Sequence, residues 1–461
     1  MRGSSHKENC HCKNYKCTSG QYPKLIFLDI RDMNGVLQTV VSMKEKPAVF
    51  KIAKELTKES SVEIEGLVGL RPKGTINDKI STGKIELQIE KIEVYNLCPA
   101  LPFELDKSDV GEDVRLKYRY LDLRRAEMQK NLFTRARVFN VIRNYLDSIG
   151  FHEFETPMLV KYTPGGARNF LVPSRIAAGK FWALPESPQL FKQLLMVAGM
   201  ERYYQIARCM RDEDLRADRQ PEFTQLDVEM SFISQDDIIQ TIEGLFKKIW
   251  KEILGVEIKT PFARMTYEEA MKKYKSDKPD LRKDKNNPNE FAFLWVVDFP
   301  LFQYDKESKK YVANHHPFTS PNMEDWNKKP ESARSVAYDL VLNGVEIGGG
   351  SIRIHNHEMQ QKVFDILKIS KEEQEKKFKF LLDALRFAPP HGGIAIGLDR
   401  LMQLMLNMQS IREVIAFPKN SDGKDVMLDA PSDVSEQQLK ELHVNVEMPK
   451  KSEKPKTKGK K

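Results

Sequence analysis

The sequence predicts an α+β protein in which a small β-barrel precedes a larger antiparallel sheet flanked by helices. Several short strand-like segments surround a single helical segment within the first 100 residues, which is typical of a small barrel. Beyond residue 130, strand and helix patterns come in separate runs rather than as alternating βαβ units, which favours an antiparallel sheet. A length of 461 residues suits two or three domains.

The predicted barrel spans residues 23–98. Its expected elements are strands at 24–30, 36–41, 61–70 and 83–94, a turn at 32–35 and a helix at 47–58. In the last strand the apolar alternation changes phase after Ile89, as it does where a β-bulge bends a curved sheet. Short strands around one helix in this order predict an OB-type barrel, a fold that often binds single-stranded nucleic acid.

A hinge is expected at residues 99–130, where prolines and then a strongly charged stretch follow the barrel. Residues 131–446 form the predicted α+β domain. Within it, amphipathic helices over 131–149 and 238–253 are expected to pack into the core, and Gly150 ends the first of them.

The two ends of the chain differ in composition from the rest. Residues 1–22 hold Cys10, His11, Cys12 and Cys17, whose spacing lacks the paired cysteines of most zinc sites, so metal binding there is only a hypothesis. Residues 447–461 form a Lys-rich tail. This tail is either solvated and disordered or a nonspecific contact for RNA phosphates.

Composition excludes several classes of protein. No apolar stretch approaches the ~18 residues that a membrane span needs, and the polar N-terminus lacks an apolar signal segment. Five cysteines are too few for a disulfide scaffold, and their odd number fits a reducing compartment. We therefore expect a cytoplasmic protein. Its formal net charge of +8 is compatible with a polyanionic partner.

Three clusters carry residue types suited to phosphate and metal chemistry. Residues 211–225 form a highly charged loop between two apolar strand-like segments, which places Arg and carboxylate side chains over a sheet. Asp339 and Glu346 precede three consecutive glycines and offer the oxygen ligands that Mg2+ prefers. Arg400 lies on the first turn of a helix that follows residues 392–397, where it could clamp a phosphate.

Together these clusters resemble the motifs of the class II aminoacyl-tRNA synthetases, and within that class the aspartyl-tRNA synthetases of the bacterial type. The class motifs match residues 151–157, 211–225 and 397–400, and residues 118–125 match the hinge signature of the aspartyl, asparaginyl and lysyl subgroup. The aspartyl assignment rests on longer matches at 187–196, 219–225 and 315–321. The resemblance covers residues 24 to 446. It implies the class II antiparallel sheet, an aspartate–tRNA ligase that uses ATP and Mg2+, and a homodimer formed through the first motif.

The resemblance also implies roles for individual residues. Arg211 would bridge the α-phosphate of ATP and the aspartate carboxylate, Phe223 would stack on adenine, and Arg400 would bind the γ-phosphate. Asp339 and Glu346 would hold Mg2+. The other implied ATP-binding residues are Asp212, Glu213, Gln220, Glu346, Gly397, Leu398 and Asp399, and Glu213 counts as catalytic together with Arg211 and Arg400.

Specificity for aspartate would need a pocket that accepts a second carboxylate. By the same resemblance Lys192 and Arg353 would supply its cations, and Asp227 would balance their charge. Asparagine would leave these cations underpaired, which would discriminate against it. The other implied aspartate-binding residues are Ser187, Gln189, Arg211, His315 and His316.

In the barrel, Phe27 and Gln38 match positions at which the family contacts anticodon bases. Phe27 would stack on a base, although a place in the barrel core is an alternative for this side chain. The implied partner is tRNA(Asp), and whether tRNA(Asn) is also charged stays open.

The sequence departs from the family pattern at three places. Gly165 stands where the family has a Glu that would hold the substrate ammonium. A short segment near residues 283–290 replaces the domain that the bacterial type usually inserts there. Residues 1–22 do not look like the family's first barrel strand, so we expect either that another segment closes the barrel or that its edge is open.

Two other functions stay open at this point. One is a catalytically impaired paralogue that only binds tRNA, which Gly165 and the Lys-rich tail would suit. The other is a tRNA-independent enzyme that uses aspartyl-adenylate to make a small amide, although such an enzyme would have no use for an anticodon-binding barrel.

Overall fold

The computed structural model describes residues 5–17, 24–107, 109–162 and 168–448, with the main chain alone described for 5–17. The chain divides into two compact units, Met1–Val110 and Gly111–Lys461, and the boundary falls inside the predicted hinge. Each unit has a hydrophobic core of its own.

The first unit is a closed five-stranded barrel with the strand order β1-β2-β3-β5-β4. Ile26, Leu28 and Ile30 alternate into its core, as the period of two in a half-buried strand requires. The register of β4 against β5 shifts between Glu65 and Gly66, opposite Ile89, which confirms the predicted bulge. The elements are β1 (Ser5–Cys17), β2 (Leu25–Arg31), β3 (Val36–Ser42), α1 (Pro47–Glu55), β4 (Ser61–Leu70) and β5 (Ile85–Asn96).

The N-terminal strand β1 corrects one prediction. We expected residues 1–22 to leave the barrel open or to be replaced by another segment, but β1 pairs antiparallel with both β2 and β4 and closes the barrel itself. The prediction was wrong because it required an apolar run, whereas the closure is built from main-chain hydrogen bonds, which polar residues form equally well. The Cys10, His11, Cys12 and Cys17 side chains lie outside the described part of the structure, so the zinc hypothesis stays a prediction.

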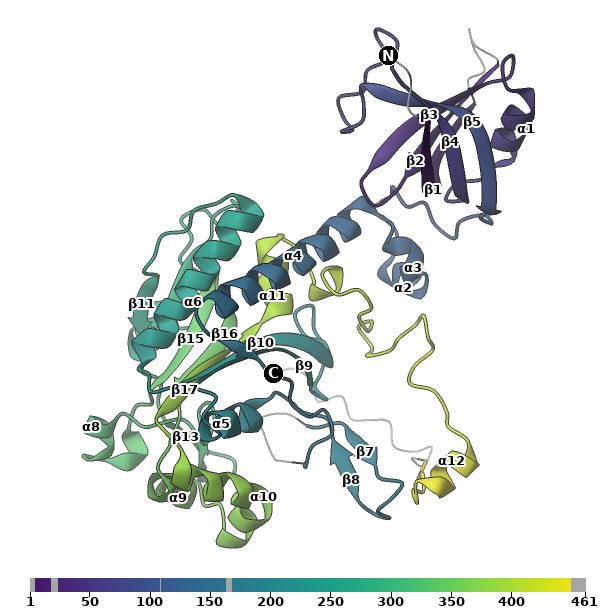
Figure 1. The fold of residues 1–461 in the computed structure, drawn as a ribbon. Helices are drawn as coiled ribbons and strands as arrows, with labels where there is room; N and C mark the ends of the chain where they lie inside the picture. Colours follow the sequence, from purple (N-terminus) through teal and green to yellow (C-terminus); the bar gives the residue numbers. More distant parts are fainter. Residues whose placement is uncertain (1–4, 18–23, 108, 163–167, 449–461) are drawn as a thin grey trace. The chain divides into compact units, whose positions relative to one another are not determined.

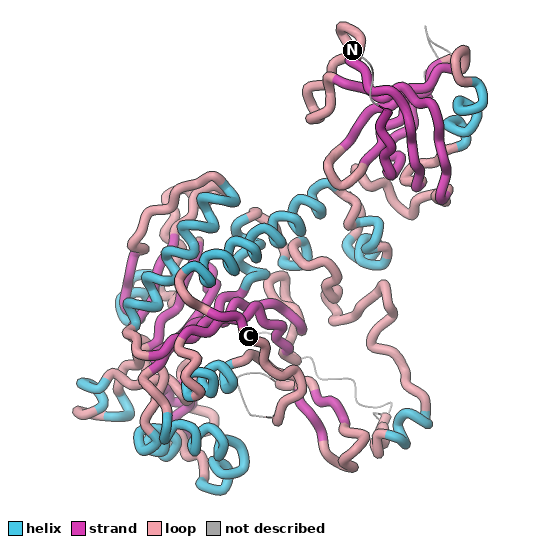
Figure 2. Tube along the Cα trace, in the orientation of Figure 1, coloured by secondary structure: helices cyan, strands magenta, loops and turns pink. Residues whose placement is uncertain are grey.

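The second unit is built on an eight-stranded sheet with the order β11-β12-β15-β16-β17-β10-β9-β6 (Figures 1 and 2). The six central strands are antiparallel as predicted, and only the edge strands β6 and β11 run parallel to their neighbours. The strands are β6 (His152–Glu153), β9 (Arg202–Met210), β10 (Glu222–Ser231), β11 (Ala263–Thr266), β12 (Phe293–Val297), β15 (Ala337–Leu342), β16 (Val345–Ile352) and β17 (His391–Gly397).

Three helices, α4 (Ala126–Ser148), α6 (Gln235–Ile249) and α11 (Leu398–Met405), pack with one face of this sheet in the largest core (Figure 1). All three were predicted, α11 as the helix that follows residues 392–397, and Gly150 follows α4 with φ +81° as a helix-ending glycine. Two apolar residues that we expected on the core face of the helix over 131–149 are exposed instead: Phe133, at 57%, and Ala136. No helix in the described ranges is long and apolar enough to cross a membrane.

Smaller elements surround the sheet. The helices are α2 (Glu112–Lys117), α3 (Arg119–Asp122), α5 (Gln189–Val197), α7 (Tyr267–Tyr274), α8 (Met323–Trp326), α9 (His357–Ile366), α10 (Lys371–Ala384) and α12 (Glu436–Glu441), and two hairpins are formed by β7 (Leu171–Pro173) with β8 (Phe181–Ala183) and by β13 (Phe302–Asp305) with β14 (Lys310–Ala313).

The alternation of apolar and polar residues along β10 shows which face of the sheet can hold a polar functional site. Leu226, Val228 and Met230 point into the core beneath α4, α6 and α11. Because neighbouring residues of a strand face opposite sides, the polar positions between them point to the other face. That face carries the site described next.

Candidate active site

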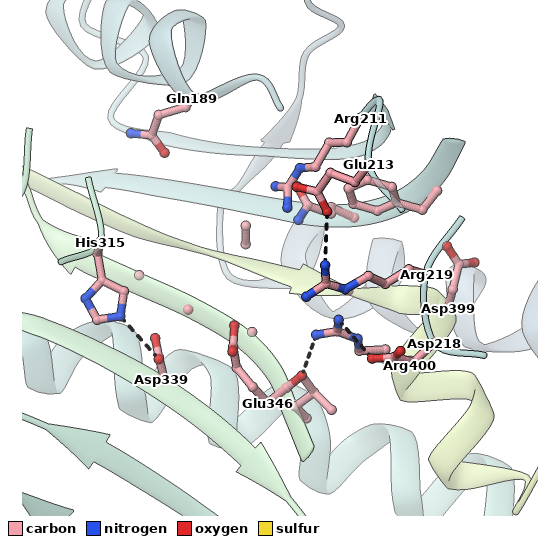
Figure 3. A pocket seen from close by; sticks show the side chains of 18 of the residues that line it. Gln189, Arg211, Glu213, Asp218, Arg219, His315, Asp339, Glu346, Asp399 and Arg400 are labelled. Carbon is pink, nitrogen blue, oxygen red and sulfur yellow. Dashed lines mark hydrogen bonds and ion pairs between the residues drawn. The ribbon is translucent and has the colours of Figure 1, made fainter. Parts of the chain in front are cut away.

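One cavity of about 490 Å³ opens on this face of the sheet. Its walls come from β10, β15, β16 and β17, from the loop that precedes β10, and from the first turn of α11 (Figure 3). All three charged clusters of the sequence therefore contribute side chains to one cavity.

Arginines and an aromatic ring gather at one end of the cavity. The guanidinium carbon of Arg211 lies 5.0 Å from the ring centroid of Phe223, and Nε of Arg211 is buried without a hydrogen-bond partner among the described residues. Such an orphaned donor is costly unless a ligand satisfies it. Arg400 donates to the main-chain oxygen of Glu346 at 3.2 Å and pairs with Asp218 at 3.2 Å, as Figure 3 shows. This end of the cavity can bind an anion with a flat aromatic group.

Two carboxylates face the cavity from neighbouring strands. His315 Nε2 lies 3.3 Å from Asp339 Oδ2, and burial together with the Asp339 charge raises the pKa of Glu346 above its ordinary value. A divalent cation between two such carboxylates would relieve their repulsion. The described residues contain no group of three or more His, Cys, Asp or Glu that could hold a metal alone. Asp339 and Glu346 could hold Mg2+, which commonly takes one or two carboxylates and completes its shell with water and substrate phosphates.

Beside this cavity lies a buried group of four charges, Lys192, Asp227, Glu229 and Arg353, which we call the charge network. Lys192 Nζ lies 2.9 Å from Asp227 Oδ1 and 3.3 Å from Glu229 Oε2. Arg353 donates through Nε and Nη2 to the two oxygens of Glu229, at 2.9 and 3.2 Å. The two cations and two carboxylates thus balance one another without a substrate.

The titration of the charge network follows from its burial and its pairing. Burial raises the pKa of Asp227 above its ordinary value despite the neighbouring Lys192 ammonium. Burial would do the same to Glu229, but Arg353 and Lys192 hold the pKa of Glu229 below its usual range. Burial, together with the Arg353 and Lys192 charges, lowers the pKa of nearby His316 to about 3, so this imidazole stays neutral at physiological pH.

The donors of Arg353 are engaged by other groups of the protein. The planar fork of its guanidinium faces Glu229, and Nη1 donates to Ser351 Oγ at 2.8 Å. Arg353 lines the cavity, whereas Lys192 is fully buried behind it. The charge network therefore offers the cavity a fixed guanidinium edge.

Most of the predicted site residues line this cavity. They are Gln189, Arg211, Glu213, Gln220, Phe223, His315, His316, Asp339, Glu346, Arg353, Gly397, Asp399 and Arg400. Five others do not line it: Ser187, Lys192, Asp212, Asp227 and Leu398. Lys192 and Asp227 act through the charge network, and Leu398 is a core residue. Gly165 lies outside the described residues.

Sequence reasoning missed several residues of the site, of which Glu229 is the most important. A signal was present, because Glu229 follows Asp227 by two positions on a predicted strand and must share its face. Glu229 lies behind the cavity wall, and the missed residues that line the cavity are Asp214, Leu215, Asp218, Arg219, Gln225, Thr319, Ile347, Gly348, Gly349, Gly350, Ser351, Ala395 and Ile411.

The predicted anticodon contacts are on the outside of the barrel. Phe27 and Gln38 are half-buried, while the core positions of their strands alternate with them. Phe27 pairs across the ladder with Val40, and Gln38 with Asp29, so the two side chains are diagonal neighbours on one outer face. The alternative of Phe27 in the barrel core is excluded.

Comparison with known proteins agrees with this architecture. Residues 111–421 match the family model described as tRNA synthetases class II (D, K and N), and residues 14–95 match the model described as OB-fold nucleic acid binding domain. In solved structures, the asparaginyl-tRNA synthetase of Pyrococcus horikoshii in complex with asparaginyl-adenylate has a TM-score of 0.73 and 23% identity, covering 90% of this chain and 95% of its own. A putative aspartyl-tRNA synthetase of Leishmania major Friedlin has a TM-score of 0.73 and 20% identity, covering 91% of each chain.

Sequence relatives are closer. The aspartate–tRNA(Asp/Asn) ligase of Hydrogenobaculum sp. (strain Y04AAS1) is 42% identical over 560 residues, covering 92% of this chain and 94% of its own. That of Dictyoglomus turgidum (strain DSM 6724 / Z-1310) is 42% identical over 552 residues, covering 92% and 93%. These alignments are longer than the 461 residues of this chain, so the relatives carry residues that it lacks. This confirms the prediction of a compact version without the inserted domain.

Proposed function

Because this chain belongs to the class II tRNA synthetases of the aspartyl, lysyl and asparaginyl group, we propose that it is an aspartate–tRNA ligase. ATP would activate L-aspartate to aspartyl-adenylate and release pyrophosphate, and the aspartyl group would then pass to the 3′-terminal ribose of tRNA. The observation that carries the proposal is the charge network, which holds the Arg353 guanidinium at the wall of the same cavity as Arg211 and Arg400. A cavity that joins such a cation to phosphate-binding arginines suits aspartate and ATP together.

The first step requires positioning and charge neutralisation more than covalent participation of the protein. The α-carboxylate of aspartate attacks the α-phosphorus of ATP, and the bond to pyrophosphate breaks. Arg211, whose buried Nε has no partner in the described part of the chain, would donate to the charge that develops on the α-phosphate. Phe223 would hold the adenine, and Arg400 the γ-phosphate. Holding both reactants in line replaces a bimolecular encounter.

Asp339 and Glu346 would hold Mg2+ against the phosphates, where the ion supplies positive charge that helps pyrophosphate to leave. The space for this arrangement comes partly from Gly349, because a Cβ there would lie 2.5 Å from Asp339 Oδ1.

The second step involves the barrel as an anticodon reader. The outward-facing Phe27 and Gln38 support this role, because a half-buried aromatic ring on an outer sheet face can stack a base. We propose both tRNA(Asp) and tRNA(Asn) as acceptors, since the relatives that match over nearly their full length are named for both. We also propose a cytoplasmic homodimer, on the resemblance of residues 151–157 to the first motif.

Aspartate-dependent exchange of labelled pyrophosphate into ATP tests the first step, with asparagine and lysine as control substrates. We expect exchange with aspartate alone. Charging of tRNA(Asp) and tRNA(Asn) in parallel tests the second step. Tight tRNA binding without any exchange would instead favour the paralogue that only binds tRNA, and exchange without charging would favour the tRNA-independent amide synthetase.

A further inference from the structure

A single buried carboxylate, that of Asp399, joins three segments that are distant in the sequence. Asp399 is 3% exposed. Its Oδ1 accepts a hydrogen bond from Nη1 of Arg135 on α4. Its Oδ2 accepts one from the main-chain N–H of Thr224 on β10, at 2.8 Å. Both oxygens of a side chain that lines the cavity are therefore engaged by the protein.

Each of these bonds fixes a neighbour that faces the cavity. Thr224 follows Phe223 in β10, so the bond to its N–H fixes the position of the main chain that carries the Phe223 ring. Asp399 precedes Arg400, so its anchorage sets the first turn of α11. Arg400 in turn contacts Glu346 and Asp218. A shift of Asp399 would move Phe223 and Arg400 together.

Arg135 is the side chain that holds Asp399 in place. Its side chain is 13% exposed, and it lies over the ring of Phe139 at 5.0 Å. It also donates to the main-chain oxygen of Val414 at 3.2 Å. The Phe139 ring and the Val414 carbonyl oxygen thus hold the guanidinium in addition to Asp399, with Nη1 donating to both oxygen acceptors. A charge-assisted bond from such a fixed donor orients its partner strongly.

We propose that Arg135 and Asp399 form a positioning pair for the nucleotide end of the cavity, and that Asp399 acts through Phe223 and Arg400 rather than by touching ATP. This inference rests on the proposed function and deepens it, because it assigns a task to a residue of α4 that lies behind the cavity wall. It also replaces the direct nucleotide contact that the resemblance implied for Asp399.

The test compares Arg135→Gln, Asp399→Asn and the double variant with Arg137→Gln. Arg137 is the matched control, since it lies on the same helix but is exposed and, among the residues that the structure describes, bonds only to the main-chain oxygen of Glu252. Pyrophosphate exchange is measured over ATP and over aspartate concentrations, well below each variant's melting temperature. We expect kcat/KM for ATP to fall about 10- to 100-fold in both single variants, since misplacement by about 1 Å can cost this much. KM for aspartate should stay within about twofold, because the charge network is not part of this pair.

Two further variants, the double variant and Arg135→Lys, test whether Arg135 and Asp399 act as a pair. If the pair acts as a unit, the double variant should be no worse than either single variant. Arg135→Lys, which keeps the charge but lacks the planar guanidinium, should recover part of the loss. If Arg135→Gln folds and has wild-type ATP kinetics while Asp399→Asn is impaired, Asp399 touches ATP directly and the inference is wrong. If the wild-type protein shows no exchange at all, the proposed function fails, and ATP binding followed by calorimetry still distinguishes the variants.

Discussion

The four residues of the charge network are more informative together than any of them alone. A buried ammonium or guanidinium is costly unless it is paired, and here two cations are matched by two carboxylates before any substrate enters. The sequence pointed to Lys192, Asp227 and Arg353 through the family resemblance. The period of two places Glu229 on the same face as Asp227, but it does not show that Glu229 pairs with Arg353, because that bond spans strands that are far apart in the chain. Long-range pairing of this kind leaves no local pattern.

Lys192→Met tests the pairing. The substitution leaves Asp227 and Glu229 buried with one cation fewer, and breaking a buried ion pair typically costs about 3–5 kcal/mol. We expect a corresponding loss of unfolding free energy in urea denaturation. The double variant Lys192→Met/Asp227→Asn should recover part of it, because one uncompensated charge is removed with its partner.

Lys248→Met is the control for this experiment, since Lys248 forms an exposed pair with Glu252 at 3.0 Å and such surface pairs contribute little. An equal loss in both single variants, or no recovery in the double variant, would contradict the importance of pairing within the charge network.

His391 provides a pH-dependent test of the same region. Burial lowers the pKa of His391, and its Nδ1 lies 2.8 Å from the main-chain oxygen of Pro389. An unfolded histidine binds a proton near pH 6.5, whereas the folded one does so only at lower pH. The unfolded state therefore binds more protons in this window, and stability falls as the pH decreases below about 6.5.

We expect the melting temperature to decrease between pH 7 and pH 5.5, and His391→Gln to make that decrease smaller. His152→Gln serves as the control because His152 is exposed. Identical pH profiles for wild type and His391→Gln would show that this imidazole does not contribute.

Among the strands, β15 and β16 show how glycines make room for chemistry. A Cβ at Gly350 would lie 2.1 Å from the main-chain oxygen of Gly393 on the next strand, whereas one at Gly349 would meet only the Asp339 side chain. Gly350 is thus required by the close approach of the neighbouring strand, and Gly349 by the Asp339 side chain in the site. The run of three glycines predicted that another part of the molecule comes close to this strand. Only the strand register shows that β17 and the Asp339 side chain are the parts that do.

Gly349→Ala should therefore weaken metal binding without unfolding the sheet. The new methyl group would push Asp339 Oδ1 from its place, so the Mg2+ concentration for half-maximal exchange should rise about 10-fold, by analogy with the loss of a supporting group at a metal site. The melting temperature should change little. Gly69→Ala on β4 is the control, because nothing lies within 4 Å of a Cβ there. An unchanged Mg2+ dependence would argue against Asp339 as a ligand.

Elements with a strong apolar period were predictable, and those held by polar contacts were not. The strands β2 to β5 follow from alternation, but β1 does not. Likewise, Arg119 in the hinge donates to the main-chain oxygens of Arg412, Ile415 and Ala416, nearly 300 positions along the chain. A main-chain acceptor has no sequence signature, so such contacts appear only in the structure.

Across the two units, the cores and the proposed chemistry are separate. Within the described ranges, the residues of the barrel core all belong to the first unit and those that line the cavity all belong to the second. A change on the outer face of the barrel should therefore alter tRNA binding without altering amino acid activation. Measuring both tRNA binding and amino acid activation in such a variant tests the barrel's role more sharply than measuring the loss of tRNA charging alone.

Phe27→Ala is the variant that tests it. Loss of one stacked base typically costs about 1–3 kcal/mol, so KM for tRNA in the charging reaction should rise about 5- to 150-fold, while aspartate-dependent pyrophosphate exchange stays at the wild-type rate. Phe27→Ala should remove the ring without unfolding the barrel, because Phe27 lies outside the barrel core. Tyr95→Ala, which removes an exposed aromatic ring from the same barrel, is the control. If both variants weaken charging equally, the effect comes from the general surface of the barrel. If neither does, Phe27 is not a base contact, and the anticodon is read elsewhere.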